Sequence, residues 1–135
     1  METHFNFDDA LFTYMVSTEV NPLFKLHLEI PKCGLYINYT KKTSVLSSFY
    51  GSNAIYIIGI CIDAYGVLER NNIPLFLLEK SDNDINKLIY ESRRLAGKFV
   101  IIFTQNNNLF AFNDPIGSLS IFYSTINSNY FSSCD

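Results

Sequence analysis

The side chains that could act as nucleophiles or proton carriers in this chain are few and widely separated. Its 135 residues include the cysteines Cys33, Cys61 and Cys134 and the histidines His4 and His27. Only Cys33 and His27, six residues apart across a predicted hairpin, are placed to form a cysteine–histidine pair for nucleophilic catalysis. A solvent-facing histidine and a cysteine in a turn is the more frequent outcome of such a pattern, and we favour that interpretation.

The acidic residues form no pair for acid–base chemistry either. Predicted turns and helix caps, where an aspartate bonds the local backbone, contain Asp8, Asp9, Asp63, Asp82 and Asp84. The cysteines lack the spacing of metal ligands, and their odd number favours a reducing, cytoplasmic setting over disulfides. We therefore expect no catalytic residue, no metal site and no cofactor site in this chain.

The composition is that of one folded domain without a nucleic-acid or membrane partner. Hydrophobic residues make up 48% and charged residues 17%, which predicts a packed core. The net charge is −3, and we place the adjacent Arg93 and Arg94 at solvated positions of a helix, so no basic surface is expected. The longest apolar run, residues 54–62, is too short for a membrane span of about 20 residues. The polar segment 1–9 does not resemble a signal peptide.

Alternation of apolar and polar residues predicts strands at both ends of the chain. Residues 24–30 and 35–40 are expected to form a hairpin with one wet face. Residues 54–62 are apolar on both faces and are expected deep in a sheet that is covered on both sides. Further strands are predicted over residues 12–17, 45–49, 99–103, 109–112, 119–123 and 129–132.

The helix signals lie in the middle of the chain. Asn72 is expected to cap a helix that has proline in its first turn and runs to about residue 80. The Ser81-x-x-Asp84 pattern predicts the start of a second helix, which carries Leu95 on its apolar face and stops at Gly97. Strands, then two helices, then strands is the order of an α+β fold.

The stretch from Gly97 to Tyr123 has the most specific order of residue types in the chain. A Gly-x-Phe opening, a hairpin, an Asp-Pro-x-Gly turn and a strand ending in tyrosine contain Gly97, Phe99, Asp114, Pro115, Gly117 and Tyr123. In such a turn the aspartate bonds the backbone two residues on, and proline presets φ. On physical grounds the turn is structural, and loss of the Asp114 side chain is expected to cost about 1 kcal/mol.

This order resembles the end of the N-terminal domain of asparagine-synthetase-like enzymes, a class II glutamine amidotransferase domain of the N-terminal-nucleophile type. The detailed match covers roughly the last forty residues, and upstream it rests on the order of elements. The resemblance implies an αββα sandwich of two mainly antiparallel sheets with flanking helices. It also implies that residues 1–135 are a single domain, either the N-terminal part of a larger synthetase or a split subunit.

The chain departs from this family at the catalytic positions. Active members use an N-terminal cysteine, exposed by removal of Met, as nucleophile, whereas position 2 here is Glu2. For the oxyanion hole the family has an Asn-Gly pair after a buried strand, and the corresponding Ile58-Gly59 keeps only the glycine. The family's acidic residue that holds the substrate amine has Asp82 and Asp84 as candidates. The resemblance thus implies a degenerate pocket, marked by Gly59, without glutaminase activity.

The first functional hypothesis is a catalytically inactive domain that supports an ATP-dependent, asparagine-synthetase-like amide ligase, structurally or by binding substrate or leader peptide. ATP and Mg²⁺ would belong to a C-terminal synthetase domain, whose Ser-Gly-Gly-x-Asp-Ser loop does not occur in this sequence. That domain or subunit would be the main partner, with a peptide or small-molecule substrate as a further one. A homodimer is compatible with this hypothesis.

The second hypothesis is a free-standing peptide- or sugar-binding module. Exposed aromatic side chains would line its site, and the candidates are Tyr36, Tyr39, Tyr50 and Tyr65. An exposed apolar patch would favour the first hypothesis, because such patches mark missing partners. An aromatic-lined cleft would favour the second.

Overall fold

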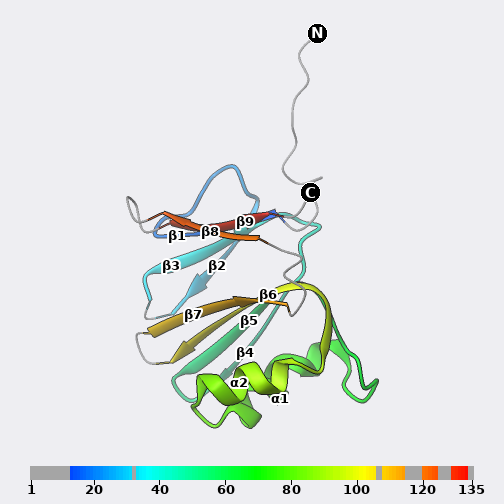
Figure 1. The fold of residues 1–135 in the computed structure, drawn as a ribbon. Coiled ribbons are helices and arrows are strands. Elements are labelled where there is room, and N and C mark those ends of the chain that lie inside the picture. The colour runs from blue at the N-terminus through cyan, green and yellow to red at the C-terminus, as the bar shows by residue number, and fades with distance from the viewer. Residues whose placement is uncertain (1–12, 32, 106–107, 115–119, 125–128, 134–135) are drawn as a thin grey trace. The chain divides into compact units, whose positions relative to one another are not determined.

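The computed structural model describes residues 13–31, 33–105, 108–114, 120–124 and 129–133, and the structural statements below concern these residues. The chain divides into two compact units (Figure 1). The first comprises Met1–Thr43 and Ser120–Asp135, and the second comprises Ser44–Leu119. Each unit contains one antiparallel sheet, and the helices lie in the second, which confirms the predicted α+β class. No described helix is long and apolar enough to cross a membrane.

The first unit is built on a five-stranded antiparallel sheet of order β2-β3-β1-β9-β8. Its strands are β1 (Thr13–Ser17), β2 (Leu26–Ile30), β3 (Leu35–Tyr39), β8 (Ser120–Ser124) and β9 (Asn129–Ser133). The register pairs Val16 and Leu28 with Ile37 on one apolar face. It pairs Met15 and His27 with Asn38 on the opposite face. The predicted hairpin with one wet face is therefore confirmed, although β2 begins at Leu26 and not at residue 24.

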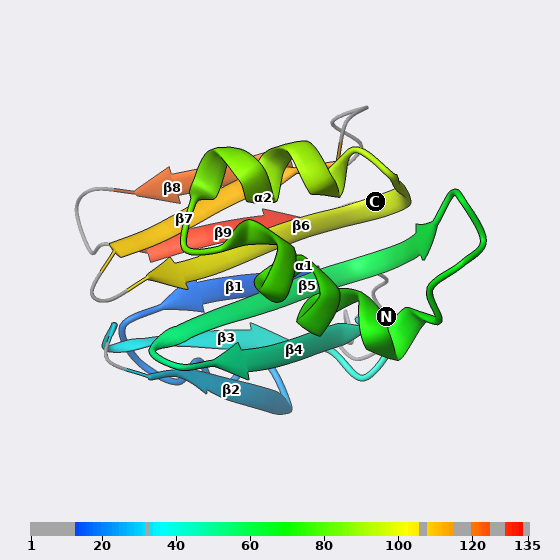
Figure 2. The ribbon, with the colours of Figure 1, turned by 90° about the horizontal axis from the view of Figure 1, so that it is seen from below.

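The second unit is a four-stranded antiparallel sheet of order β4-β5-β6-β7 with helices on one face. Its elements are β4 (Val45–Tyr50), β5 (Asn53–Asp63), the 3-10 helix η2 (Arg70–Asn72), α1 (Ile73–Ser81), α2 (Ile85–Ser92), β6 (Leu95–Gln105) and β7 (Asn108–Asn113). Figure 2 shows α1 and α2 on the same face of this sheet. The side chains buried between helices and sheet include Ile55, Ile57, Leu77, Leu88, Phe99 and Ile101.

The central strands β5 and β6 extend beyond their neighbours. β4 pairs with β5 only as far as Ile58, and β7 pairs with β6 only as far as Val100. On the two-stranded extension that follows, Ile60 and Ile62 are 50% and 54% exposed on the face opposite the helices. The prediction that residues 54–62 are covered on both sides is therefore wrong for the last part of β5, because the neighbouring strands end earlier.

The helix signals locate the helices correctly but assign some boundary residues to the wrong role. Asn72 precedes α1 without a side-chain capping bond, because it already belongs to η2. Ser81 ends α1, and its hydroxyl donates to the Leu78 carbonyl (2.7 Å) instead of capping α2. The N-cap of α2 is Asp84, whose carboxylate accepts the N–H of Asn86 (2.9 Å).

The second helix also ends earlier than its apolar pattern predicts. α2 stops at Ser92, and Leu95 and Gly97 lie in β6. Leu95 is buried in the second unit as a strand residue and pairs with Asp63 of β5. Gly97 therefore does not end the helix. The need for glycine at this position is explained by the packing of β6 against β5.

Candidate functional site

Three residues of the family motif, Gly97, Phe99 and Asp114, meet on the sheet of the second unit with Gly59, the glycine of the degenerate pocket. Gly59 lies opposite Phe99 in the β5–β6 register, and Gly97 lies opposite Cys61. Asp114 follows β7 and is bonded to Phe99. Of the other motif residues, Pro115 and Gly117 fall outside the described residues, and Tyr123 lies in β8, where only the backbone is described.

The Asp114 carboxylate ends the pairing of β6 with β7. Its Oδ2 accepts the backbone N–H of Phe99 (3.3 Å), and the N–H of Asp114 donates to the Phe99 carbonyl (3.0 Å). The last strand pair of this ladder is Val100–Asn113, so the carboxylate takes the place of the next backbone acceptor. The predicted bond from the Asp114 side chain to the backbone two residues further on involves residue 116, which lies outside the described residues. The hydrogen-bond partner that the structure shows, Phe99, lies on the neighbouring strand β6.

Replacement of Asp114 by alanine is expected to lower the free energy of unfolding by about 2 kcal/mol, more than the value of about 1 kcal/mol expected from the turn alone, because the partner is a buried N–H. The substitution would leave the buried N–H of Phe99 without this acceptor. Urea denaturation of Asp114→Ala and Asp114→Asn tests this, because asparagine keeps an acceptor oxygen and should lose less than half as much. Equal losses in the two variants would show that the bond to Phe99 does not stabilise the fold.

Gly59 and Gly97 let the backbones of β5 and β6 approach each other closely. Their φ angles are +111° and +130°, values that residues other than glycine rarely adopt. A Cβ on Gly59 would lie 2.2 Å from the Lys98 carbonyl oxygen, and one on Gly97 would lie 2.1 Å from that of Ile60. The Gly59 N–H donates to the Ser44 carbonyl (2.8 Å), so this N–H is already engaged and does not face a substrate oxyanion.

The described cysteines lack the features of an activated nucleophile. Cys61 is fully buried in the core of the second unit, as expected for a residue of the apolar run 54–62, and burial raises the pKa of its thiol to about 12. Burial also raises the pKa of Cys33. Because the thiolate is the reactive form, both changes oppose nucleophilic chemistry. Cys134 lies outside the described residues.

His27 and Cys33 do not form a catalytic pair. The His27 Nδ1 atom lies 2.8 Å from the Asn38 side-chain oxygen in the middle of the β2–β3 ladder. The turn that contains Cys33 begins after the Ile30–Leu35 pair, roughly 10 Å further along the strand. The favoured interpretation, an exposed histidine and a cysteine in a turn, is confirmed.

A buried ion pair that the sequence analysis missed joins Asp63, at the end of β5, to Arg94. The guanidinium donates from Nε to Oδ1 (2.9 Å) and from Nη2 to Oδ2 (2.8 Å). The same carboxylate accepts the backbone N–H groups of Tyr65, Val67 and Leu68 at 2.9–3.1 Å. The Asp63 side chain is 0% exposed and that of Arg94 is 15% exposed, so the prediction of a solvated Arg94 is wrong.

This ion pair is a structural connection and not an acid–base centre. The hydrogen bonds from Arg94 hold the pKa of Asp63 well below its usual range, and three backbone N–H groups act in the same direction against the effect of burial. The guanidinium lies over the rings of Tyr65 and Phe76, at 4.8 Å and 4.7 Å from their centroids. A carboxylate so strongly held in its ionised form does not exchange protons near neutral pH.

In the first unit a fully buried asparagine connects the polar face of the sheet to the loop that follows β1. The Asn38 Nδ2 atom donates to the Met15 carbonyl (3.0 Å) and to the Ser17 hydroxyl (2.8 Å). Its Oδ1 atom accepts the backbone N–H of Asn21 (2.9 Å) and lies 2.8 Å from His27 Nδ1. Because this oxygen only accepts, a hydrogen bond between these two atoms has His27 Nδ1 as its donor.

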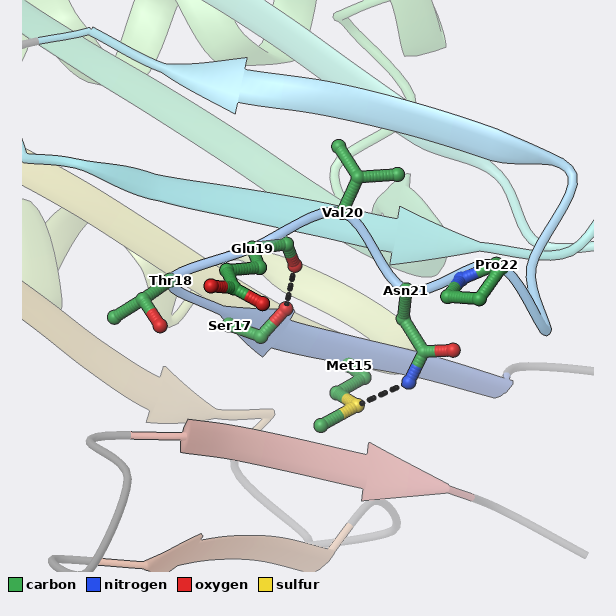
Figure 3. A pocket seen from close by; sticks show the side chains of 7 residues that line it. All are labelled: Met15, Ser17, Thr18, Glu19, Val20, Asn21 and Pro22. Carbon is green, nitrogen blue, oxygen red and sulfur yellow. Dashed lines mark hydrogen bonds between the residues drawn. The ribbon is translucent and has the colours of Figure 1, made fainter.

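The loop held by Asn38 borders a pocket of about 480 Å³, shown in Figure 3. Within the loop, the Ser17 hydroxyl donates to the Glu19 carbonyl (2.5 Å), and the Asn21 Nδ2 donates to the Met15 sulfur (3.3 Å). The described residues that line the pocket are Met15, Ser17, Thr18, Glu19, Val20, Asn21 and Pro22. Sequence reasoning assigned nothing to this loop, although an asparagine inside the strand Leu35–Tyr39 is unusual and was a usable signal.

Replacement of Asn38 by alanine is expected to lower the free energy of unfolding by about 3 kcal/mol and to release the loop. Four bonds would be lost, and two of them hold Ser17 and the backbone of Asn21. Denaturation and amide hydrogen exchange at Asn21 measure the two effects. Asn86→Ala, at an exposed position of α2, is the matched control and should stay within about 0.5 kcal/mol. Unchanged exchange at Asn21 would contradict this role of Asn38.

The candidate aromatic residues are distributed unevenly. Tyr36 and Tyr39 are half-buried, whereas Tyr50 and Tyr65 are exposed. Tyr65 borders a smaller hollow of about 210 Å³ in the second unit. The other described residues of this hollow are Tyr90, Glu91, Arg93 and Arg94.

The other candidate positions have structural roles as well. Asp84 caps α2, and the exposed Asp82 lies 3.8 Å from the ammonium group of Lys87. In the part of the chain that the structure describes, no three His, Cys, Asp or Glu side chains form a group that could hold a metal ion. Comparisons with known proteins add no assignment, because no family model, no curated protein and no solved structure matches this chain.

Proposed function

We propose that this chain is a non-catalytic, glutamine-amidotransferase-like domain that supports an asparagine-synthetase-like, ATP-dependent amide-forming enzyme. The observation that carries the proposal is the meeting of three motif residues, Gly97, Phe99 and Asp114, with the pocket glycine Gly59. Gly59 and Gly97 permit the close approach of β5 and β6, and Asp114 is bonded to Phe99 at the end of the next ladder. Residues chosen for their resemblance to the family motif thus form one connected structural unit.

The missing catalytic groups support a domain that does not hydrolyse glutamine. Position 2 is Glu2, the Cys61 thiol is buried in the core, and the Gly59 N–H is bonded to Ser44. The amine used by the parent enzyme would then come from a source other than glutamine, and ATP and Mg²⁺ would be bound by the synthetase partner. Within the described residues of this chain, no group is proposed to hold either of them.

The finer fold proposed here is the αββα sandwich of the resemblance. The sheet of the second unit has helices on one face and apolar side chains, including Ile58 and Ile102, on the other. The sheet of the first unit has an apolar face that includes Ile30 and Ile37. Nuclear Overhauser contacts between isoleucine methyl groups of the two sheets test the proposed sandwich, and their absence would contradict it.

The exposed end of β5 supports the presence of a partner. Ile60 and Ile62 point to the same side of a two-stranded extension and are about half exposed. Exposed apolar side chains at neighbouring positions fit a surface that another domain covers. We propose that the synthetase domain or subunit covers this surface.

The test is the mass and the partners of the native gene product in its own cells. The proposal predicts either a protein much larger than 15.5 kDa that continues into a Ser-Gly-Gly-x-Asp-Ser loop, or a 15.5 kDa chain that co-purifies with such a protein. In the second case, an Ile60→Ser/Ile62→Ser variant should lose the partner, and the control Leu75→Ser, on exposed α1 surface, should keep it. A 15.5 kDa chain without a synthetase partner would refute the proposal.

The alternative, a free-standing peptide- or sugar-binding module, is favoured by the hollow at Tyr65 and Tyr90. Both rings are exposed, and Arg93 and Arg94 lie over the rings of Tyr90 and Tyr65, respectively. The pocket bordered by Met15 and residues 17–22 has no aromatic residue among those described, so it does not support this alternative. Binding of a peptide or oligosaccharide that Tyr90→Ala abolishes would favour the module.

A further inference from the structure

The start of β6 directs backbone groups to an open edge of the second unit. The N–H and C=O of Phe99 point away from β5, because both are bonded to Asp114. Backbone groups of successive strand residues point to alternate sides, and the β5–β6 register runs without a break past Gly97. The N–H and C=O of Gly97 therefore also point away from β5. The Arg94 carbonyl accepts the Ala64 N–H (2.8 Å) and points toward β5, in agreement with this alternation.

No described strand lies beside Gly97 on that outer side. The pairing of β6 with β7 has already ended where Asp114 is bonded to Phe99. Ala96, Gly97 and Lys98 are exposed, although they are three consecutive residues of one strand. An exposed strand edge that presents N–H and C=O groups is a template for pairing with another chain.

The sheet face beside this edge carries exposed apolar side chains. Ile60 pairs with Lys98 and Ile62 pairs with Ala96, so these four side chains lie on one face. Ile60 and Ile62 are 50% and 54% exposed. A strand added at Gly97 would place an alternate side chain beside Ala96, on the face of the two isoleucines. One extended segment would therefore bond the open backbone groups and also cover apolar surface.

A second copy of this chain does not fit the edge. Antiparallel pairing of two copies about Gly97 would bring Leu95 of one copy beside Phe99 of the other. Asp114 already occupies that place through its bonds to Phe99. The same bonds limit any added segment, which must end or turn away beside Asp114. The occupant that fits is a short extended segment of a different chain.

We propose that the β6 edge at Gly97 binds an extended segment of the synthetase partner by strand addition. The backbone of that segment would accept the Gly97 N–H and donate to the Gly97 carbonyl. An apolar side chain of the segment would lie against Ala96 and Ile62. The identity of the partner rests on the proposed function, whereas the open edge is a property of this chain alone.

The first experiment measures amide hydrogen exchange in the isolated, ¹⁵N-labelled chain. The Gly97 N–H is expected to exchange rapidly. The N–H of Lys98, which points toward β5, and that of Phe99, which is bonded to Asp114 (3.3 Å), are expected to be protected and serve as internal controls. Slow exchange at Gly97 in the isolated chain would show that its edge is already occupied and would overturn the proposal.

The second experiment adds the peptide acetyl-Thr-Val-Thr-Val-Thr-amide as the probe of strand addition. Saturation with this peptide should slow exchange at Gly97 about tenfold, because the amide gains an acceptor. The same peptide with N-methylated threonines lacks the N–H groups of the pairing edge and should leave Gly97 unchanged. Ile62→Ser should weaken binding of the probe about tenfold, and the control Leu75→Ser, on exposed α1 surface, should bind like the original chain.

Strand addition and the proposed function can fail separately. Strand addition is overturned if the probe does not protect Gly97, if the N-methylated peptide protects it equally, or if Ile62→Ser and Leu75→Ser bind the probe equally. Protection of Gly97 by the probe, together with a native chain that no synthetase accompanies, would refute the proposed function and its partner. Strand addition at this edge would then stand without them.

Discussion

Replacement of Gly97 by alanine is expected to lower the free energy of unfolding by about 4 kcal/mol, a large part of the 5–15 kcal/mol typical of a domain. The new Cβ would lie 2.1 Å from the Ile60 carbonyl oxygen, and its φ of +130° is strained for alanine. The Cβ is attached directly to the backbone of β6, and the Ile60 carbonyl belongs to the backbone of β5, so relief requires β5 and β6 to separate. Chemical denaturation of the variant, with circular dichroism as readout, measures the loss.

The control for Gly97 is Gly66, which also has a positive φ (+70°) but has no atom within 4 Å of the position of its Cβ. Gly66→Ala should therefore cost only about 1 kcal/mol, the usual strain of a left-handed residue. Gly59→Ala should behave like Gly97→Ala, because its Cβ would lie 2.2 Å from the Lys98 carbonyl oxygen. Similar losses for Gly66 and Gly97 would show that close strand packing does not determine the effect.

Gly97 also shows where local sequence patterns stop being sufficient. A glycine after a helical pattern predicts a helix C-terminus, and this local rule gave the wrong role. The true reason for the glycine is the Ile60 carbonyl, which belongs to a strand far away in the sequence. By contrast, the alternation in residues 26–30 and 35–39 reports directly on one buried face, so this hairpin was predictable.

In the candidate site, too, local sequence predicts the role of some residues but not their distant partners. The structural role of Asp114 followed from its residue type and its turn, but its partner Phe99 lies across the sheet and was not predictable. The residues next to Arg94 in the sequence predict an exposed helix end, and this local pattern places Arg94 in solvent. Its partner Asp63 is 31 residues away, and no local pattern connects the two. The buried role of Asn38 likewise depends on a loop that crosses the polar face of the sheet.

Asp63→Asn is expected to lower the Tm by roughly 10 °C. The amide cannot accept five hydrogen bonds as the carboxylate does, and it leaves the largely buried Arg94 without its counter-ion. The control Asp82→Asn removes an exposed carboxylate at 3.8 Å from Lys87 and should change the Tm by no more than about 2 °C. Thermal melts of the two variants at neutral pH compare the loss in Tm from the buried ion pair with the loss from a surface ion pair.

The same carboxylate gives the fold a defined acid sensitivity. The pKa of Asp63 is lower in the folded chain than in the unfolded one, so its contribution is complete above the unfolded value of about 4. Below that pH the unfolded chain binds the proton more readily, and the contribution is lost progressively as the pH falls toward the folded pKa. Denaturation midpoints between neutral pH and about pH 2 should therefore fall less steeply with acid for Asp63→Asn than for the original chain and for Asp82→Asn. An identical slope in all three proteins would mean that Asp63 is not held in its ionised form by Arg94.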